Sequence, residues 1–214
     1  VDGILNVWGQ LKRLTPEYDP YVNILKTLNP QDLLRYYPGS PYIALELLRP
    51  TDRAYFCELH PYEHQILQTL PNLRKKAHIE CCDGIEQLSA LLPPVEKRGL
   101  VFIDPSYEIK AEYKTIPKAI HEAYLRFPTG VFCLWYPIIK DNLHRQLISR
   151  LKQIPAQKTL HVEFKLDPLP PNGMNACGLW IINPPYTLAQ ELKSALGVLT
   201  SIINPGSSEY LVES

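Results

Sequence analysis

The sequence lacks an excess of charge of either sign and lacks a long hydrophobic run. Its 214 residues include 22 Lys and Arg and 22 Asp and Glu, so no overall basic field indicates a nucleic-acid partner. The clusters Arg74-Lys75-Lys76 and Lys97-Arg98 are more typical of solvated surface than of a binding patch. No apolar run approaches the roughly 18 residues that a membrane-spanning helix needs. We therefore expect no membrane partner.

The cysteines and histidines lack the spacing of disulfide frameworks and of metal sites. The five cysteines are an odd set without a Cys-x-x-Cys pair, and four of them lie in apolar runs. This usage indicates small buried thiols in a reducing, cytoplasmic setting. The six histidines show no metal-ligand spacing, so we expect no metal.

The sequence does contain a regular alternation of short β-rich runs with helical patterns from Ser40 onward. A chain of this length can form one sizeable α/β domain. Strands that alternate with helices predict right-handed crossovers and a parallel sheet. Residues 1–38 predict one or two helices before a Pro-rich link. The expected strands are 53–58, 77–82, 99–103 and 130–136, and the expected helices are 61–70, 84–92, 112–126 and 141–154.

The last two expected strands, 159–166 and 178–182, break this alternation. The first has period-two polarity, as a strand with one wetter face would. The loop 167–177 between them is too short and too rich in Pro and Gly for a helical crossover, so the pair is predicted to be antiparallel. A mostly parallel sheet that ends in an antiparallel hairpin predicts an α/β fold of the class I, Rossmann-like methyltransferases that use S-adenosylmethionine.

Two tetrapeptides have the form of an amino-group methyltransferase site. Asp104-Pro105-Ser106-Tyr107 follows the strand 99–103, and Asn183-Pro184-Pro185-Tyr186 follows the strand 178–182. Ligands of open α/β sheets bind outside the carboxyl ends of the parallel strands. Asp104 leaves that edge, whereas an antiparallel last strand places Asn183 at the opposite edge. We therefore predict the Asp104 motif as the site, and the Asn183 motif as a turn in which Pro ends a strand.

Acidic residues close three successive expected strands, namely Glu58, Asp83 and Asp104. One carboxylate can accept hydrogen bonds from ribose hydroxyls, another from an adenine amino group, and the third can face the substrate. Taken alone, Glu58 and Asp83 would more simply cap the helices that follow them. Acids on three successive strand ends favour a cofactor site, with all three carboxylates at one edge.

The Asp104 motif suits methylation of an exocyclic base nitrogen. The Asp104 carboxylate and the Pro105 carbonyl can each accept one amine hydrogen, which aims the nitrogen lone pair at the methyl donor. Tyr107 can stack on the face of a base that has been flipped out of its helix.

Several short motifs are spread along nearly the whole chain. They are Tyr36-Tyr37-Pro38-Gly39-Ser40-Pro41, Glu58-Leu59-His60-Pro61, Asp83-Gly84, Arg98-Gly99-Leu100 with Asp104-Pro105-Ser106-Tyr107, Leu134-Trp135-Tyr136-Pro137 and Gly173-Met174. Together they resemble the RlmJ family of bacterial 23S rRNA adenine-N6 methyltransferases. The resemblance implies that Ser40, Glu58, Asp83 and Gly84 contact S-adenosylmethionine, and that Asp104 is the catalytic acceptor. It also implies 23S rRNA as the partner and adenine N6 as the target.

The same resemblance implies a division of the chain. Residues 1–38 match a helical insertion subdomain, residues 39–214 match the methyltransferase core, and loop 167–177 lies near the substrate entrance. Two features depart from the family: Ser106 replaces a second proline, and the ten glycines include no Gly-x-Gly pair. We therefore expect an N-terminally incomplete chain, with the first strand and the glycine-rich loop upstream.

Two other functions stay open from the sequence. Members of the family have also been linked to the use of external DNA, so a non-catalytic or DNA-directed relative, with DNA as its partner, is one alternative. A nucleotide-dependent oxidoreductase in which Glu58 binds an NAD ribose is the other, although no residue stands out for hydride transfer.

Overall fold

The computed structural model describes residues 2–31, 33–70, 77–139, 141–166, 174, 176–203 and 206–214. Contacts divide the chain into two compact units, Val1–Gln87 and Leu88–Ser214. None of the helices described is both long and apolar enough to cross a membrane. The expected division into an insertion, 1–38, and a core, 39–214, stays a prediction.

The first unit begins with the helices expected in residues 1–38. Helix α2 carries Asp19 and Pro20 in its first turn, where an acid and a proline favour helix initiation. Its apolar face buries Val22 and Leu25. The helical elements there are α1 (Asp2–Trp8), the 3-10 turns η1 (Leu11–Arg13) and η2 (Pro16–Tyr18), and α2 (Asp19–Leu28). Helix α3 (Ser40–Leu47) follows this range and was not predicted.

The first unit also contains two parallel strands. β1 (Ala54–Cys57) pairs with β2 (Ala77–Glu80), and α4 (Pro61–Leu67) lies between them in the sequence. α6 (Gly84–Leu91) follows β2 and continues into the second unit. These strands and helices fall within the ranges predicted from the sequence.

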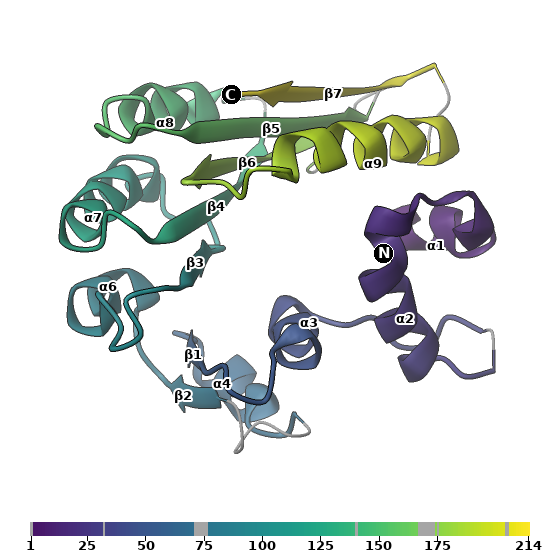
Figure 1. Ribbon diagram of the computed structural model, residues 1–214, viewed down its shortest axis with the longest axis horizontal. Helices are drawn as coiled ribbons and strands as arrows, with labels where there is room; N and C mark the ends of the chain where they lie inside the picture. The colour runs from purple at the N-terminus through teal and green to yellow at the C-terminus, as the bar shows by residue number, and fades with distance from the viewer. Residues whose placement is uncertain are drawn as a thin grey trace. The chain divides into compact units, whose positions relative to one another are not determined.

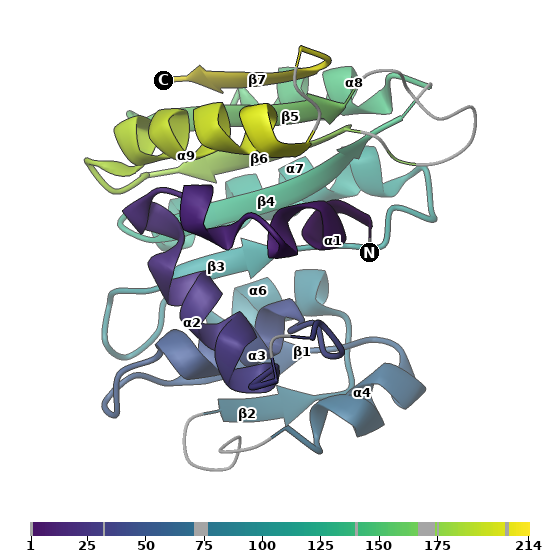
Figure 2. The ribbon, with the colours of Figure 1, turned by 90° about the vertical axis from the view of Figure 1, so that its right-hand side faces the viewer.

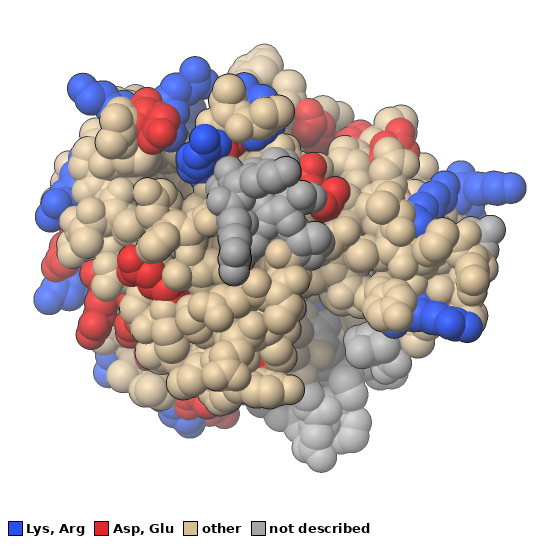
Figure 3. All heavy atoms as spheres, turned by 90° about the horizontal axis from the view of Figure 1, so that it is seen from below, with Lys and Arg blue, Asp and Glu red and all other residues tan. Residues whose placement is uncertain are grey.

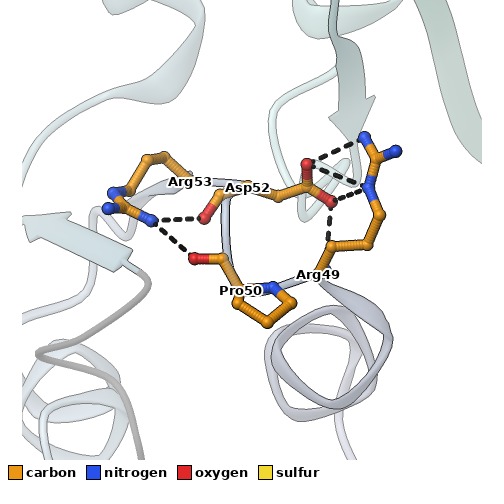
Figure 4. Close-up of polar contacts among 4 residues, drawn as sticks. All are labelled: Arg49, Pro50, Asp52 and Arg53. Atoms are coloured by element: carbon orange, nitrogen blue, oxygen red, sulfur yellow. Dashed lines mark hydrogen bonds and ion pairs between the residues drawn. The ribbon is translucent and has the colours of Figure 1, made fainter.

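A compact polar turn joins α3 to β1 (Figure 4). The Arg49 guanidinium donates to the Asp52 carboxylate, with Nη2 2.9 Å from Oδ1 and Nε 3.0 Å from Oδ2. Nη1 of Arg53 donates to the carbonyls of Pro50 and Asp52, at 3.2 and 2.9 Å. Both guanidinium groups thus bind within the turn, which sets the direction in which the chain enters β1.

A five-stranded sheet forms the second unit, in the order β3-β4-β6-β5-β7. β3 and β4 are parallel, and β6 lies antiparallel between β4 and β5. The predicted antiparallel pair is therefore confirmed. The edge strand β7, antiparallel to β5, was not predicted. The strands are β3 (Leu100–Ile103), β4 (Val131–Ile138), β5 (Thr159–Leu166), β6 (Ala176–Ile182) and β7 (Ser208–Glu213).

Helices cover both faces of this sheet (Figures 1 and 2). α7 (Glu112–Arg126) and α8 (Leu143–Leu151) lie on one face, where Phe132 contacts the rings of Tyr124 and Phe127. α9 (Leu188–Ile203) lies on the other face, over a core that includes Leu160 and Ile181. Burial of each such side chain stabilises the fold by about 1.5–3 kcal/mol. Packing on both faces therefore fixes the positions of the strand ends in this unit.

Candidate active site

Glu58 and Asp83 lie at the same edge of the first unit, because each follows the carboxyl end of one of its two parallel strands. The Glu58 backbone N–H donates to the Glu80 carbonyl at 3.1 Å and so extends the pairing of β1 with β2. Oε1 of Glu58 accepts from the His60 backbone N–H at 2.8 Å. Oδ1 of Asp83 accepts from the Ile85 backbone N–H at 2.7 Å. The helix-capping interpretation is therefore correct for Asp83, which caps α6.

Each of these carboxylates keeps one oxygen for another partner. Oε2 of Glu58 and Oδ2 of Asp83 take no hydrogen bond within the described part of the chain. Gly84 lets α6 approach β1 closely, because a Cβ there would lie 3.1 Å from the Cβ of Cys57. Ser40 is exposed at the start of α3. Carboxylates with free oxygens beside a close backbone approach fit a nucleoside with hydroxyl and amino groups.

Asp104 lies where the chain leaves the carboxyl end of β3 in the second unit. β3 ends at Ile103, which pairs with Leu134 of the parallel strand β4. The Asp104 side chain is exposed, while partial desolvation raises the pKa of its carboxyl group above the ordinary value. A raised pKa makes the ionised carboxylate a stronger hydrogen-bond acceptor. Because Glu58 and Asp83 belong to the first unit, their convergence with Asp104 stays a prediction.

Tyr107 has an unusual conformation for a bulky residue. Its φ is +55°, and the left-handed region costs an L-residue other than glycine about 1–2 kcal/mol. The side chain is only 8% exposed, and its hydroxyl donates to the Trp135 carbonyl at 2.8 Å. Its ring lies 4.8 Å from that of Tyr113. The Tyr107 ring is thus packed against other parts of the protein. Its stacking on a base stays a prediction.

Asn183 lies at the opposite edge of the second unit's sheet. It follows Ile182, which pairs with Phe132 at the start of β4. Nδ2 of Asn183 donates to the carbonyls of Pro128 and Gly130, both at 2.8 Å. By strand register it lies four residues, or about 13 Å, from the level of Asp104. The prediction that the Asn183 motif is a strand-ending turn is confirmed.

A buried polar cluster that the sequence did not reveal lies between β4, β5 and α8. The Tyr136 hydroxyl is 2.7 Å from Nε2 of His161 and 3.2 Å from Oε1 of Glu163. Lys165 Nζ lies 3.1 Å from the other Glu163 oxygen, and the His144 ring stacks parallel to Tyr136. The polar face of 159–166, which we expected to be more exposed to solvent, is therefore largely covered by protein. The alternation of polar residues along 159–166 was the only sequence signal for this cluster. The side chains that cover the cluster come from distant segments of the chain.

Charge and metal-binding groups add little to this picture. Figure 3 shows one face, on which Lys and Arg side chains lie in separate groups with Asp and Glu among them. In the ranges that the structure describes, no group of three or more His, Cys, Asp or Glu is placed to hold a metal ion. The basic cluster Arg74-Lys75-Lys76 and residues 167–173 and 175 of the expected entrance loop lie outside the described residues.

The fold defines a class of protein. Parallel strands joined by helices, followed by a reversed strand inserted before the last parallel one, are the architecture of a class I, Rossmann-like methyltransferase. Such sheets bind ligands outside the carboxyl ends of their parallel strands, and Asp104 follows that end of β3 in the second unit.

Comparison with known proteins identifies the family. The chain belongs to the family described as ribosomal RNA large subunit methyltransferase D, RlmJ, whose sequence model matches residues 1–213. It is 38% identical over 211 residues to the ribosomal RNA large subunit methyltransferase J of Escherichia coli, covering 98% of this chain and 75% of that protein. The Haemophilus influenzae protein of the same name is 40% identical over 215 residues, with 99% and 76% covered.

A solved structure agrees with the fold. The crystal structure of a Legionella pneumophila protein has a TM-score of 0.93 and 48% sequence identity to this chain. The match covers 98% of this chain and 78% of the Legionella pneumophila chain. The predicted α/β methyltransferase fold and the family resemblance are both confirmed, and the oxidoreductase alternative is set aside.

Proposed function

We propose that this protein transfers a methyl group from S-adenosylmethionine to the N6 amino group of an adenine in 23S rRNA, in the cytoplasm. The observation that carries this proposal is Asp104, an exposed carboxylate with a raised pKa at the carboxyl end of β3, in a member of a ribosomal RNA methyltransferase family. The two relatives named ribosomal RNA large subunit methyltransferase J support rRNA as the substrate class.

The residues proposed for the cofactor are Ser40, Glu58, Asp83 and Gly84. The carboxylates of Glu58 and Asp83 each use one oxygen for a backbone N–H, which fixes their orientation. The second oxygen of each remains for a ribose hydroxyl or an adenine amino group. S-adenosylmethionine, when bound, supplies the electrophilic methyl group. The side chain of Ser40 and the bare backbone of Gly84 complete the set.

Asp104 and Pro105 are proposed to hold the target amine. The Asp104 carboxylate accepts one amine hydrogen and the Pro105 carbonyl accepts the other, which orients the nitrogen lone pair for in-line attack. With S-adenosylmethionine bound, the nitrogen–carbon bond would form as the sulfur–carbon bond of the cofactor breaks, and the proton that the amine loses would pass to solvent water. Because an adenine within a folded RNA is stacked, it has to be flipped out to reach these two acceptors.

The test of this proposal is Asp104→Asn in the full-length protein. The amide keeps the size of the side chain but loses the carboxylate, so methyl transfer to 23S rRNA is expected to fall about 100-fold or more. Binding of S-adenosylmethionine, measured by calorimetry, should change less than about threefold, because Asp104 is proposed to act on the amine. Turnover is measured with labelled cofactor, and the modified base by mass spectrometry of the rRNA.

Glu122→Gln is the matched control, since Glu122 is an exposed carboxylate on α7. It should leave turnover unchanged. Undiminished methyl transfer by Asp104→Asn would show that another group accepts the hydrogen bond from the target amine. Methylation of DNA oligonucleotides in place of rRNA would favour the DNA-directed alternative, and a parent protein that binds no S-adenosylmethionine would favour the non-catalytic one.

A further inference from the structure

The Tyr107 side chain is held at two points within the second unit. Its hydroxyl donates to the Trp135 carbonyl at 2.8 Å, and its ring packs 4.8 Å from Tyr113 and 6.3 Å from Trp135. It is 8% exposed, whereas Asp104, Ser106 and Glu108 around it are exposed. Tyr107 therefore points into the protein from a loop whose other side chains point out.

The hydroxyl contact lies just past the last paired residues of two strands. Pairing of β3 with β4 ends at Ile103 and Leu134, so Trp135 is the first β4 residue beyond it. Its carbonyl can no longer accept from a β3 backbone N–H, and a carbonyl in this partly buried position needs another partner. The Tyr107 hydroxyl supplies that partner, and so ties the loop to β4 after β3 has ended.

The backbone conformation at Tyr107 depends on these contacts. Its φ of +55° is disfavoured for a bulky residue, and such conformations persist only where the surroundings enforce them. Pro105 has a φ fixed by its ring, but Ser106 has no such restraint. The turn that aims Asp104 and the Pro105 carbonyl is therefore restrained on its far side by Tyr107.

We propose that Tyr107 is a positioning residue for methyl transfer, whose hydroxyl bond to the Trp135 carbonyl fixes the turn carrying Asp104 and Pro105. This inference rests on the proposed function and differs from a role as a stacking platform. A platform needs an open aromatic face, whereas a positioning residue needs the hydroxyl. The substitution Tyr107→Phe separates the two roles, because it keeps the ring and removes only the bond.

Tyr113→Phe is the matched control. The Tyr113 side chain is 2% exposed and lies against the same ring, but its buried hydroxyl has no hydrogen-bond partner in the described ranges. Its removal thus deletes a tyrosine hydroxyl beside Tyr107 without deleting a bond.

The experiment measures methyl transfer to rRNA and amide hydrogen exchange of residues 104–111 in the full-length parent and both variants. In Tyr107→Phe we expect kcat to fall about 10-fold or more, because small displacements of reacting groups are costly. KM for cofactor and for RNA should stay within about threefold. Exchange of residues 104–111 should accelerate in Tyr107→Phe alone, and Tyr113→Phe should keep the parent's kcat.

Three results would overturn the inference. A kcat for Tyr107→Phe within twofold of the parent would show that the ring suffices. A raised KM for RNA at constant kcat would indicate direct contact with the substrate. An equal loss in Tyr113→Phe would indicate general packing. Failure of the proposed function is distinct: the parent would not methylate rRNA, and the exchange measurement alone would then support or reject the hydroxyl anchor.

Discussion

Glu163 shows how a single buried charge can be retained in the core of this protein. It is 7% exposed, yet hydrogen bonding from His161 and then from Lys165 outweighs desolvation and lowers the pKa of its carboxyl group to about 2. Burial raises the pKa of the neighbouring Tyr136 and lowers that of His144, which favours the neutral form of both side chains. The stability of the second unit therefore depends on pH through the ionisation of one residue, Glu163.

A first prediction concerns acid stability. Because the Glu163 pKa is lower in the folded state than its ordinary value of 4.5, its stabilisation is complete above about pH 5 and is lost as the pH falls toward about 2. Glu163→Gln should lower the free energy of unfolding at pH 7 by up to about 3 kcal/mol. It should also flatten the pH dependence between about 5 and 2.

Urea denaturation at several pH values measures this effect. Glu122→Gln is again the control, because an exposed carboxylate on α7 contributes little. An unchanged acid dependence in Glu163→Gln would show that other carboxyl groups dominate acid unfolding.

At the scale of elements, β6 fits between β4 and β5 only because Gly178 has no side chain. The strand pairs Gly178 with Tyr136 of β4 and with Glu163 of β5. A Cβ at Gly178 would lie 2.2 Å from the hydroxyl and Cζ of Tyr136. The Tyr136 ring thus covers this glycine, and the reversed strand and the polar cluster depend on each other.

The second prediction tests this fit. Gly178→Ala should lower the free energy of unfolding by about 2 kcal/mol or more, because the buried Tyr136 ring has to move. Gly197→Ala in α9 is the matched control, since its Cβ would meet only the Tyr210 hydroxyl at 3.6 Å. It should be neutral or stabilise the protein by up to about 1 kcal/mol, as alanine favours helix interiors. Equal effects of the two substitutions in urea denaturation would contradict the proposed fit.

At the scale of the whole second unit, the two edges of the sheet have different roles. The carboxyl edge of β3 and β4 carries Asp104, while the opposite edge is closed by Asn183 across Pro128 and Gly130. Asn183 has a φ of +53°, which asparagine tolerates better than most residues. One edge thus presents an exposed carboxylate, whereas the other is closed by hydrogen bonds from Asn183.

A third prediction separates the two edges. Asn183→Ala should cost about 1–3 kcal/mol of stability, since it leaves carbonyls without their donor. Its methyl-transfer rate per folded molecule should stay within a small factor of the parent. Asp104→Asn should show the reverse, with preserved thermal stability and lost turnover. Catalytic collapse in a well-folded Asn183→Ala protein would make the Asn183 motif part of the site.

Local patterns alone were sufficient to predict the strand directions. The choice of the Asp104 motif over the Asn183 motif as the site rests on these directions and stays a prediction. The short Pro- and Gly-rich connection before Gly178 excludes a helical crossover, which reverses β6 and sends Asn183 to the edge opposite Asp104. Periodicity also placed most helices and strands, because it depends only on neighbours in the sequence. The edge strand β7 was missed, since its pairing with β5 joins segments more than 40 residues apart.

The tertiary structure alone decided which polar and aromatic side chains are covered. His161 and Glu163 alternate along β5 as solvent-facing residues would, but Tyr136 covers them from a strand about 25 residues away. The sequence predicts that Tyr107 stacks on a base, and only the structure shows that its hydroxyl binds the Trp135 carbonyl and its ring packs against Tyr113. A sequence period determines which residues share a face, whereas burial depends on what folds over that face, and those contacts come from distant parts of the chain.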